Sequence, residues 1–280
     1  MGSPCRAHVM INFSDLLWKS NRGATHRFAG PFFPNVEEND RPFVLEHVSI
    51  DEANPQPGSC AALLMDPRGV GADRFRYLRM RLRELRHAAK LQSIVITSPD
   101  PEDGKSTIAM CLATFLAVGG KHPVLLVEAD LHHPTLANVL GLEPRPGLAE
   151  CLENKLDPLQ AIRKIEPLGW YFLHAGDVKS NPAELLQPDS LAKLMQRLTP
   201  AFDWIVIDSP PVLPLTDALA LSREVDATLL VARADRTPRE ALDEAIKLIG
   251  RKRLIGVVLN SAGHLTRRYS KYDHYYKAQS

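Results

Sequence analysis

The segment 94–107 constrains the fold of this chain more than any other stretch. A β-branched apolar run over 94–97 leads into a polar turn, and Gly104–Thr107 then opens an apolar helical pattern. This order predicts a strand, a phosphate-binding loop and a helix, whose first N–H groups form an anion site. Lys105 can reach the terminal phosphates, and the Ser106 hydroxyl can hold Mg²⁺. The segment therefore predicts binding of a nucleoside triphosphate.

The loop departs from the general pattern G-x-x-x-x-G-K-[ST] in two ways. Pro99 stands where the first glycine is expected, and Glu102 and Asp103 place negative charge beside a site for anions. An ordinary strand, turn and helix with an acidic N-terminus is the alternative interpretation, because Asp and Glu favour helix starts. The nucleotide interpretation is favoured only because other segments agree with it.

Composition excludes several classes of protein. A chain of 280 residues that is 45% hydrophobic can form one α/β domain or two small ones. The net charge of +1 argues against a general nucleic-acid binder. The scattered cysteines indicate reduced thiols rather than a disulfide frame or a zinc site. Without a membrane-length apolar run or a signal-peptide pattern, we expect a cytoplasmic protein that meets the membrane only through a partner.

Three regions follow one another along the chain. Residues 1–70 are interrupted by prolines and predict an irregular arm or linker, with 11–18 as one candidate amphipathic helix. Residues 71–264 carry the α/β pattern, and 265–280 form a tail. Within the second region, 73–90 predicts a helix with an apolar stripe and basic residues on its other faces. That basic surface is either solvated or an interaction surface for a subunit or an anionic membrane.

The alternation of strands and helices after this helix predicts a doubly wound α/β domain with a mostly parallel sheet flanked by helices. The candidate strands are mostly continuous apolar runs, as expected for strands buried on both faces. Ligands of such sheets sit at the carboxyl ends of the strands. The strands are expected at Ile94–Thr97, Val124–Glu128, Trp170–His174, Trp204–Asp208, Thr228–Ala232 and Ile255–Asn260, with helices including Lys105–Val118, Ser190–Leu198 and Pro238–Leu248.

Three carboxylates stand at the ends of two candidate strands. Glu128 and Asp130 follow one strand and Asp208 ends another, so all three are expected to face the phosphate loop. One carboxylate there can hold Mg²⁺ and a second can accept a proton from an attacking group. The alternative is that acids at strand ends only cap loops. The adjacent His132 and His133 are more simply polar loop residues or a subunit contact than zinc ligands.

The C-terminal segment concentrates tyrosine. Four of the six tyrosines of the chain, Tyr269, Tyr272, Tyr275 and Tyr276, fall in its last residues, without a periodicity that would bury them. A disordered tail is the natural expectation. Its phenols, with a pKa of about 10, would need a base and a positioned phosphate to react. The alternative is an aromatic tail that docks on a partner.

With these motifs in view, residues 70–280 resemble the bacterial tyrosine autokinases (BY-kinases), a class related to the partitioning and septum-placement ATPases among the P-loop NTPases. The tail resembles the tyrosine cluster that this family autophosphorylates. Five further segments carry the resemblance: a Walker A loop (Thr97–Thr107), the family-specific Walker A′ (Leu125–Pro134), Walker B (Trp204–Val212), Ser180–Leu186 and Gly256–Asn260.

The resemblance implies roles for individual residues. The segment from Asp103 through Gly104, Lys105, Ser106 and Thr107 would bind the phosphates of ATP, and Asn260 would lie near the adenine. Mg²⁺ would be positioned by Ser106 and Asp208, with help from Asp130, and Glu128 would be the base for the incoming tyrosine.

The resemblance also implies a homo-oligomeric ring formed through helix 73–90, whose Asp73-x-x-Arg76-x-x-Arg79 is similar to the family's oligomerisation motif. Each tail would enter a neighbouring subunit, and the partner would be a membrane-embedded polysaccharide chain-length regulator at the inner face of the membrane. Four residues depart from the family pattern: Glu128 replaces Asp, His132 replaces Arg, Glu102 replaces a common Gly, and Asp73 replaces Glu.

Two rival functions remain open at the level of the sequence. The first is an ATPase switch of the partitioning and septum-placement type without kinase activity. Those proteins carry an additional lysine early in the loop, where this chain has Asp100. The second is a non-catalytic scaffold of a polysaccharide assembly complex.

Overall fold

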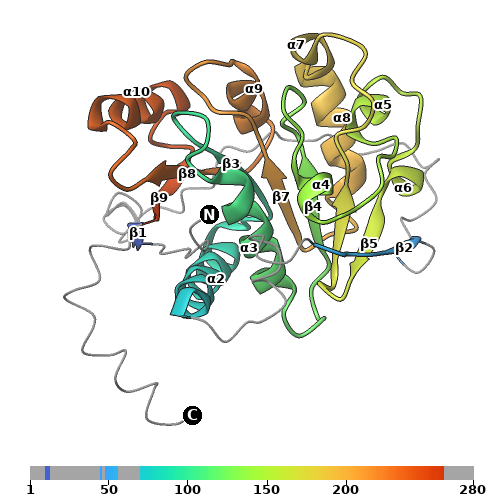
Figure 1. Cartoon of the computed structure of the whole chain (residues 1–280), viewed down its shortest axis with the longest axis horizontal. Coiled ribbons are helices and arrows are strands. Elements are labelled where there is room, and N and C mark those ends of the chain that lie inside the picture. The colour runs from blue at the N-terminus through green and yellow to red at the C-terminus, as the bar shows by residue number, and fades with distance from the viewer. Residues whose placement is uncertain (1–9, 13–44, 46–47, 56–69, 262–280) are drawn as a thin grey trace, which may run out of the picture.

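The fold is a mostly parallel sheet with helices on both faces, seen in a computed structural model that describes residues 10–12, 45, 48–55 and 70–261 (Figure 1). Within these residues the sheet has nine strands in the order β1-β9-β8-β3-β7-β4-β6-β5-β2. Only the β1–β9 and β5–β6 pairs are antiparallel. The doubly wound α/β architecture predicted from the sequence is confirmed.

The central strands are buried along their whole length, which explains their continuous apolar sequences. The strands are β1 (Met10–Asn12), β2 (Ile50–Glu52), β3 (Ser93–Thr97), β4 (Val124–Glu128), β5 (Arg163–Glu166), β6 (Trp170–Leu173), β7 (Trp204–Asp208), β8 (Ala227–Arg233) and β9 (Leu254–Asn260). The helices are α2 (Val70–Ala89), α3 (Lys105–Ala117), α4 (Leu136–Val139), α5 (Leu148–Leu152), α6 (Pro158–Ala161), α7 (Pro182–Leu185), α8 (Pro188–Leu198), α9 (Asp217–Arg223) and α10 (Arg239–Ile249).

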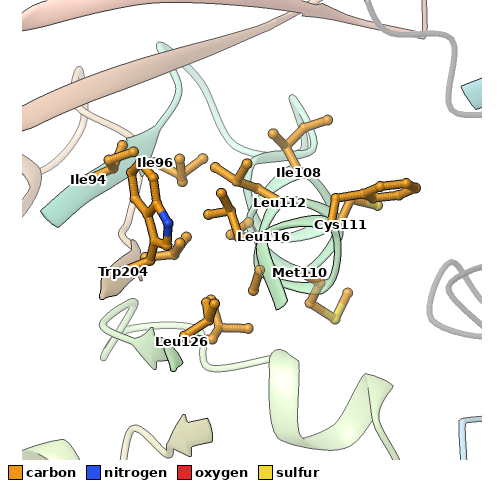
Figure 2. Close-up of a cluster of buried hydrophobic side chains, with 14 of the residues drawn as sticks. Ile94, Ile96, Ile108, Met110, Cys111, Leu112, Leu116, Leu126 and Trp204 are labelled. Atoms are coloured by element: carbon orange, nitrogen blue, oxygen red, sulfur yellow. The ribbon is translucent and has the colours of Figure 1, made fainter. Parts of the chain in front are cut away.

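Alternate residues of each central strand face two different hydrophobic cores. On one face of the sheet, Ile94 and Ile96 of β3 and Trp204 of β7 pack against α3, as Figure 2 shows. On the other face, Val95 and its neighbours pack against α5, α7 and α8. Figure 1 shows these three helices across the sheet from α2 and α3. Because these strands are packed on both faces, the carboxyl ends of β3, β4 and β7 have fixed positions side by side at one edge of the sheet.

Helix α2 packs on α3 through the apolar stripe expected from its sequence. Leu78 and Leu82 are fully buried, and the ring of Phe75 stacks on that of Phe115 with centroids 5.4 Å apart. The guanidinium of Arg79 donates to the backbone carbonyl of Phe115 over 3.1 Å. The opposite face of the helix leaves Tyr77 and Met80 half-exposed among arginines.

The structure differs from the sequence-based expectation mainly in the N-terminal region and at β5. The segment from 11 was expected to start a helix, but Ile11 and Asn12 lie in β1, which pairs with β9. Strand β2 likewise adds part of the expected irregular arm to the sheet beside β5. Strand β5 was missed because Arg163–Glu166 is short and mostly polar. Strand β5 pairs antiparallel with β6, which follows it directly in the chain, and parallel with β2, which lies far from it in the sequence.

Candidate nucleotide-binding and active site

The phosphate loop leads directly from β3 into α3. Gly104, the residue before the helix, has φ +97°, in the left-handed region that favours glycine. A Cβ at this position would overlap the side-chain amide of Asn260. No side chain caps the start of α3, so the helix presents its first N–H groups for an anion. The local geometry is therefore that of a phosphate site.

Asp103 and Asn260 hold the shape of this loop from within. The buried carboxylate of Asp103 accepts hydrogen bonds from the Thr237 hydroxyl at 2.7 Å and from the Asp100 N–H at 3.3 Å. Burial raises the pKa of Asp103, while the hydrogen bond from Thr237 acts in the opposite direction. The Asn260 amide donates to the Asp103 carbonyl over 3.0 Å. Both residues thus support the loop, and the expected adenine contact of Asn260 stays a prediction.

Lys105 points at Asp130 across the carboxyl edge of the sheet. Its ammonium nitrogen lies 3.0 Å from Asp130 Oδ2, and both side chains are largely buried. The other oxygen of Asp130 accepts a hydrogen bond from the His133 backbone N–H at 3.1 Å. The pair places a largely buried cation and a buried anion together at the phosphate loop.

Asp208 is the carboxylate of the site with a strongly raised pKa. Its side chain is buried, and neither of its oxygens has a hydrogen-bond partner among the described residues. Burial is the main cause that raises its pKa to about 7. The positive charge of Lys105 lowers this pKa. The Ser106 hydroxyl also lowers it, although it makes no hydrogen bond of normal geometry to Asp208. Two unpartnered carboxylate oxygens beside a hydroxyl are a suitable donor set for a divalent cation.

Glu128 lies beside Asp208 in the sheet, because the two residues are register partners on β4 and β7. Its carboxylate accepts a hydrogen bond from the Leu136 N–H at 2.6 Å and another from the Ala175 N–H at 3.3 Å. Burial raises the pKa of Glu128, and these backbone donors act against that shift. Its oxygens therefore join β4 to α4 and to the chain after β6, which agrees with the alternative that acids at strand ends cap neighbouring segments.

His132 and His133 do not form a metal site with their neighbours. Nε2 of His132 lies 2.9 Å from the buried carboxylate of Asp217 at the start of α9. Within residues 70–261 and the shorter described segments, no group of three or more His, Cys, Asp or Glu side chains could hold a metal ion by itself. A cation at Asp208 would accordingly need oxygen ligands from a bound nucleotide as well.

Residues around the turn after β8 complete the site, and sequence reasoning missed them. Thr237 bonds Asp103, and Arg233 and Arg236 both contact Glu102. No local signal marks them, because they lie more than 130 positions from the loop that they contact. The four tail tyrosines lie outside the described residues, so the site is defined without its expected substrate.

The residues present fit ATP and Mg²⁺. The phosphates match the uncapped start of α3 and the ammonium of Lys105. The cation matches the orphaned oxygens of Asp208, with Ser106 at hand. A loop of this kind at the carboxyl end of a central parallel strand defines a P-loop nucleotide-binding protein.

Comparison with known sequences shows which P-loop proteins this chain is similar to. The chain is 30% identical over 214 residues to the tyrosine-protein kinase YwqD of Bacillus subtilis, a match that covers 76% of this chain and 89% of YwqD. It is 29% identical to the succinoglycan biosynthesis transport protein ExoP of Rhizobium meliloti, over 80% of this chain but 29% of ExoP. No model of a known protein family matches the sequence.

Comparison with solved structures points to the same class of protein. The kinase domain of the Escherichia coli tyrosine kinase ETK superposes with a TM-score of 0.67 at 26% identity, over 70% of this chain and 78% of that domain. The Pyrococcus furiosus cell division ATPase MinD superposes less well, with a TM-score of 0.51 at 26% identity, over 59% of this chain and 69% of MinD. The chain therefore belongs to the family of bacterial tyrosine-protein kinases, and its enzyme class is that of a protein-tyrosine kinase.

Proposed function

We propose that this chain uses ATP and Mg²⁺ to phosphorylate the tyrosines of its own C-terminal segment, each subunit acting on the tail of a neighbour. The observation that supports this best is the group formed by Lys105, Asp130 and the unpartnered carboxylate of Asp208 beside the phosphate loop. The acceptors would be Tyr269, Tyr272, Tyr275 and Tyr276. Phosphorylation would regulate the synthesis or export of an exopolysaccharide.

In the reaction, a tail phenol attacks the γ-phosphate in line with the departing oxygen of ADP. Lys105 places its positive charge next to the negative charge that develops on the transferred group. Ser106 and Asp208, with Asp130, would hold Mg²⁺, which neutralises phosphate charge when bound.

The phenol must also lose its proton to a carboxylate. Glu128 is the base implied by the family resemblance. Its burial and its two backbone donors make that role testable against a purely structural one.

Mass spectrometry of the full chain after incubation with Mg·ATP tests the proposal. Phosphotyrosine is expected in residues 269–276 of the parent chain, and Lys105→Ala and Asp208→Ala should abolish it. Lys121→Ala is the matched control, because Lys121 is exposed and lies beyond the C-terminal end of α3, whereas the loop precedes the N-terminal end. Labelling that persists in both site variants would refute this mechanism.

A mixing experiment tests transfer between subunits. Lys105→Ala with an intact tail is combined with a chain whose four tail tyrosines are changed to phenylalanine. Phosphate on the Lys105→Ala chain requires transfer from the other subunit. An unlabelled mixture, with a parent chain that labels itself, would leave only transfer within one chain.

The proposed ring would form through α2. This helix presents Tyr77 and Met80 half-exposed, and an open groove there is lined by Arg76, Arg79, Arg83 and other residues. A half-exposed apolar pair among arginines is typical of an interface. Met80→Asp should lower the mass of the assembly in light scattering, whereas Leu248→Asp, at a similarly exposed apolar position on α10, should leave it unchanged.

The partner and the location are proposed from the relatives. ExoP is named as a succinoglycan biosynthesis transport protein. In the described residues no helix has the length and apolar character to cross a membrane. By analogy with the transport role in the name of ExoP, we propose contact with a membrane-embedded chain-length regulator at the inner membrane face.

A nucleotide switch without kinase activity is the second candidate, favoured by the superposition on MinD. It predicts ATP hydrolysis or ATP-dependent association without phosphotyrosine. The same mass-spectrometric measurement separates the two functions.

A further inference from the structure

Glu102 occupies a backbone conformation that its side chain disfavours. Its φ is +63°, in the left-handed region where glycine is the usual residue. The residue lies in the phosphate loop, two positions before Gly104. The chain therefore keeps a strained carboxylate where a flexible neutral residue would cost less and would not repel phosphate.

Two arginines hold Glu102 in place: Arg233 at the end of β8 and Arg236 in the turn that follows. The guanidinium of Arg236 lies 2.7 Å from Glu102 Oε2, and that of Arg233 donates to the Glu102 carbonyl over 3.2 Å. The hydrogen bond from Arg236 is the main cause that lowers the pKa of Glu102. Glu102 is therefore an anion matched by a cation.

The same turn holds the next residue of the loop. The backbone N–H of Arg233 donates to the Thr237 hydroxyl oxygen at 2.7 Å, and that hydroxyl donates to Asp103 at 2.7 Å. Residues 233–237 thus bind two successive residues of the phosphate loop from one side. The arrangement fixes both the position of the loop and its local charge.

Folding stability does not account for the Arg236–Glu102 pair. The side chains are 47% and 73% exposed, and ion pairs this exposed contribute little to stability. The pair can instead act on a bound polyanion, because an uncompensated carboxylate in the loop would repel phosphate. Arg233 adds a second positive charge at the same place.

We propose that Arg236 is a positioning residue for the nucleotide, which acts through Glu102. By neutralising and holding that carboxylate, Arg236 allows a loop with glutamate in a glycine-like conformation to accept the phosphates. This inference rests on the proposed function, since it assumes a nucleoside triphosphate or diphosphate at the start of α3.

A double-mutant cycle tests it by calorimetry with Mg·ADP. Arg236→Ala should weaken binding by about fivefold, the equivalent of an ion pair at the upper end of the exposed range. Glu102→Gly should bind as tightly as the parent or more tightly. In the Glu102→Gly background, Arg236→Ala should then change the affinity by less than about twofold.

Three additional measurements separate positioning from other effects. The loss in Arg236→Ala should shrink as salt is raised, because screening weakens the exposed carboxylate. Arg236→Lys, which keeps the charge, should recover most of the affinity. Arg239→Ala is the matched control, since Arg239, the first residue of α10, is 88% exposed and faces Asp243 instead of the loop.

The outcomes are distinct. Equal losses from Arg236→Ala with and without Glu102 would overturn the inference, because Arg236 would then act on the nucleotide itself. An unchanged affinity in Arg236→Ala would overturn it too, and would leave the proposed function intact. A parent chain without affinity for Mg·ADP or Mg·ATP would refute the proposed function and this inference with it.

Discussion

Replacing Asp208 by asparagine is expected to stabilise the ligand-free protein while it removes activity. The pKa of Asp208 is raised from 3.8 to about 7, mainly by burial. Because the folded-state pKa exceeds the unfolded one, this carboxyl group favours folding less and less as the pH rises from about 4 to about 7. Above that range the full effect of the buried anion opposes folding.

The magnitude follows from the shift. A rise of about three pKa units corresponds to about 4 kcal/mol at pH 8, at 1.36 kcal/mol per unit. Asp208→Asn removes the charge but leaves a buried amide without an evident partner, which costs about 1–3 kcal/mol. We therefore expect a net gain of about 1–3 kcal/mol at pH 8. At pH 4 the gain disappears, because Asp208 is protonated in the folded parent.

Urea unfolding in a chelating buffer, followed by tryptophan fluorescence, measures this difference, since Trp204 is buried at the start of the same strand. The control is Asp226→Asn. Asp226 accepts hydrogen bonds from the Gln92 and Ser93 N–H groups, so its loss should destabilise the protein. A stability difference between Asp208→Asn and the parent that stays constant from pH 4 to 8 would refute the reasoning. So would a less stable variant at pH 8.

Three further predictions concern the site and its support. Buried His174 has a pKa lowered to about 4 by burial, so its contribution to stability is complete above pH 6.5 and is lost as the pH falls toward 4. His174→Phe, measured by urea unfolding in the Asp208→Asn background, should remove that loss of about 3 kcal/mol. An unfolding free energy that still falls equally between pH 6.5 and pH 4 would contradict this expectation. Gly104→Ala should abolish nucleotide binding in calorimetry, whereas Gly119→Ala, with a similar φ of +95° but open space around it, should not; equal binding by both would count against the overlap with Asn260. Glu128→Ala should lower the unfolding free energy by about 2–4 kcal/mol by leaving two buried N–H groups unpaired, and Glu128→Gln should keep tail phosphorylation if the role is structural and lose it if Glu128 is the base.

Much of the site followed from local patterns. The strand before the loop, Gly104 at the start of α3 and the acids that end β4 and β7 all stand where the sequence indicated. The cap of α7 is local in the same way, since Asn181 Oδ1 accepts the Ala183 N–H at 3.1 Å. These features depend on residues close in sequence, so hydrophobic periodicity and turn chemistry report them directly.

The contacts that give those residues their properties did not follow from the sequence. Strand order and register place Glu128 beside Asp208. The surrounding fold supplies the backbone N–H of Leu136, which donates a hydrogen bond to Glu128. The contact of Arg236 with Glu102 likewise joins residues far apart in the chain.

The sequence by itself determined which segments become strands and helices and where a phosphate would bind. Only the tertiary structure decided which carboxylate is left unpartnered, which is used structurally, and which arginine neutralises the loop. The physical reason is that secondary structure depends on neighbours along the chain, whereas burial and charge pairing depend on neighbours in space.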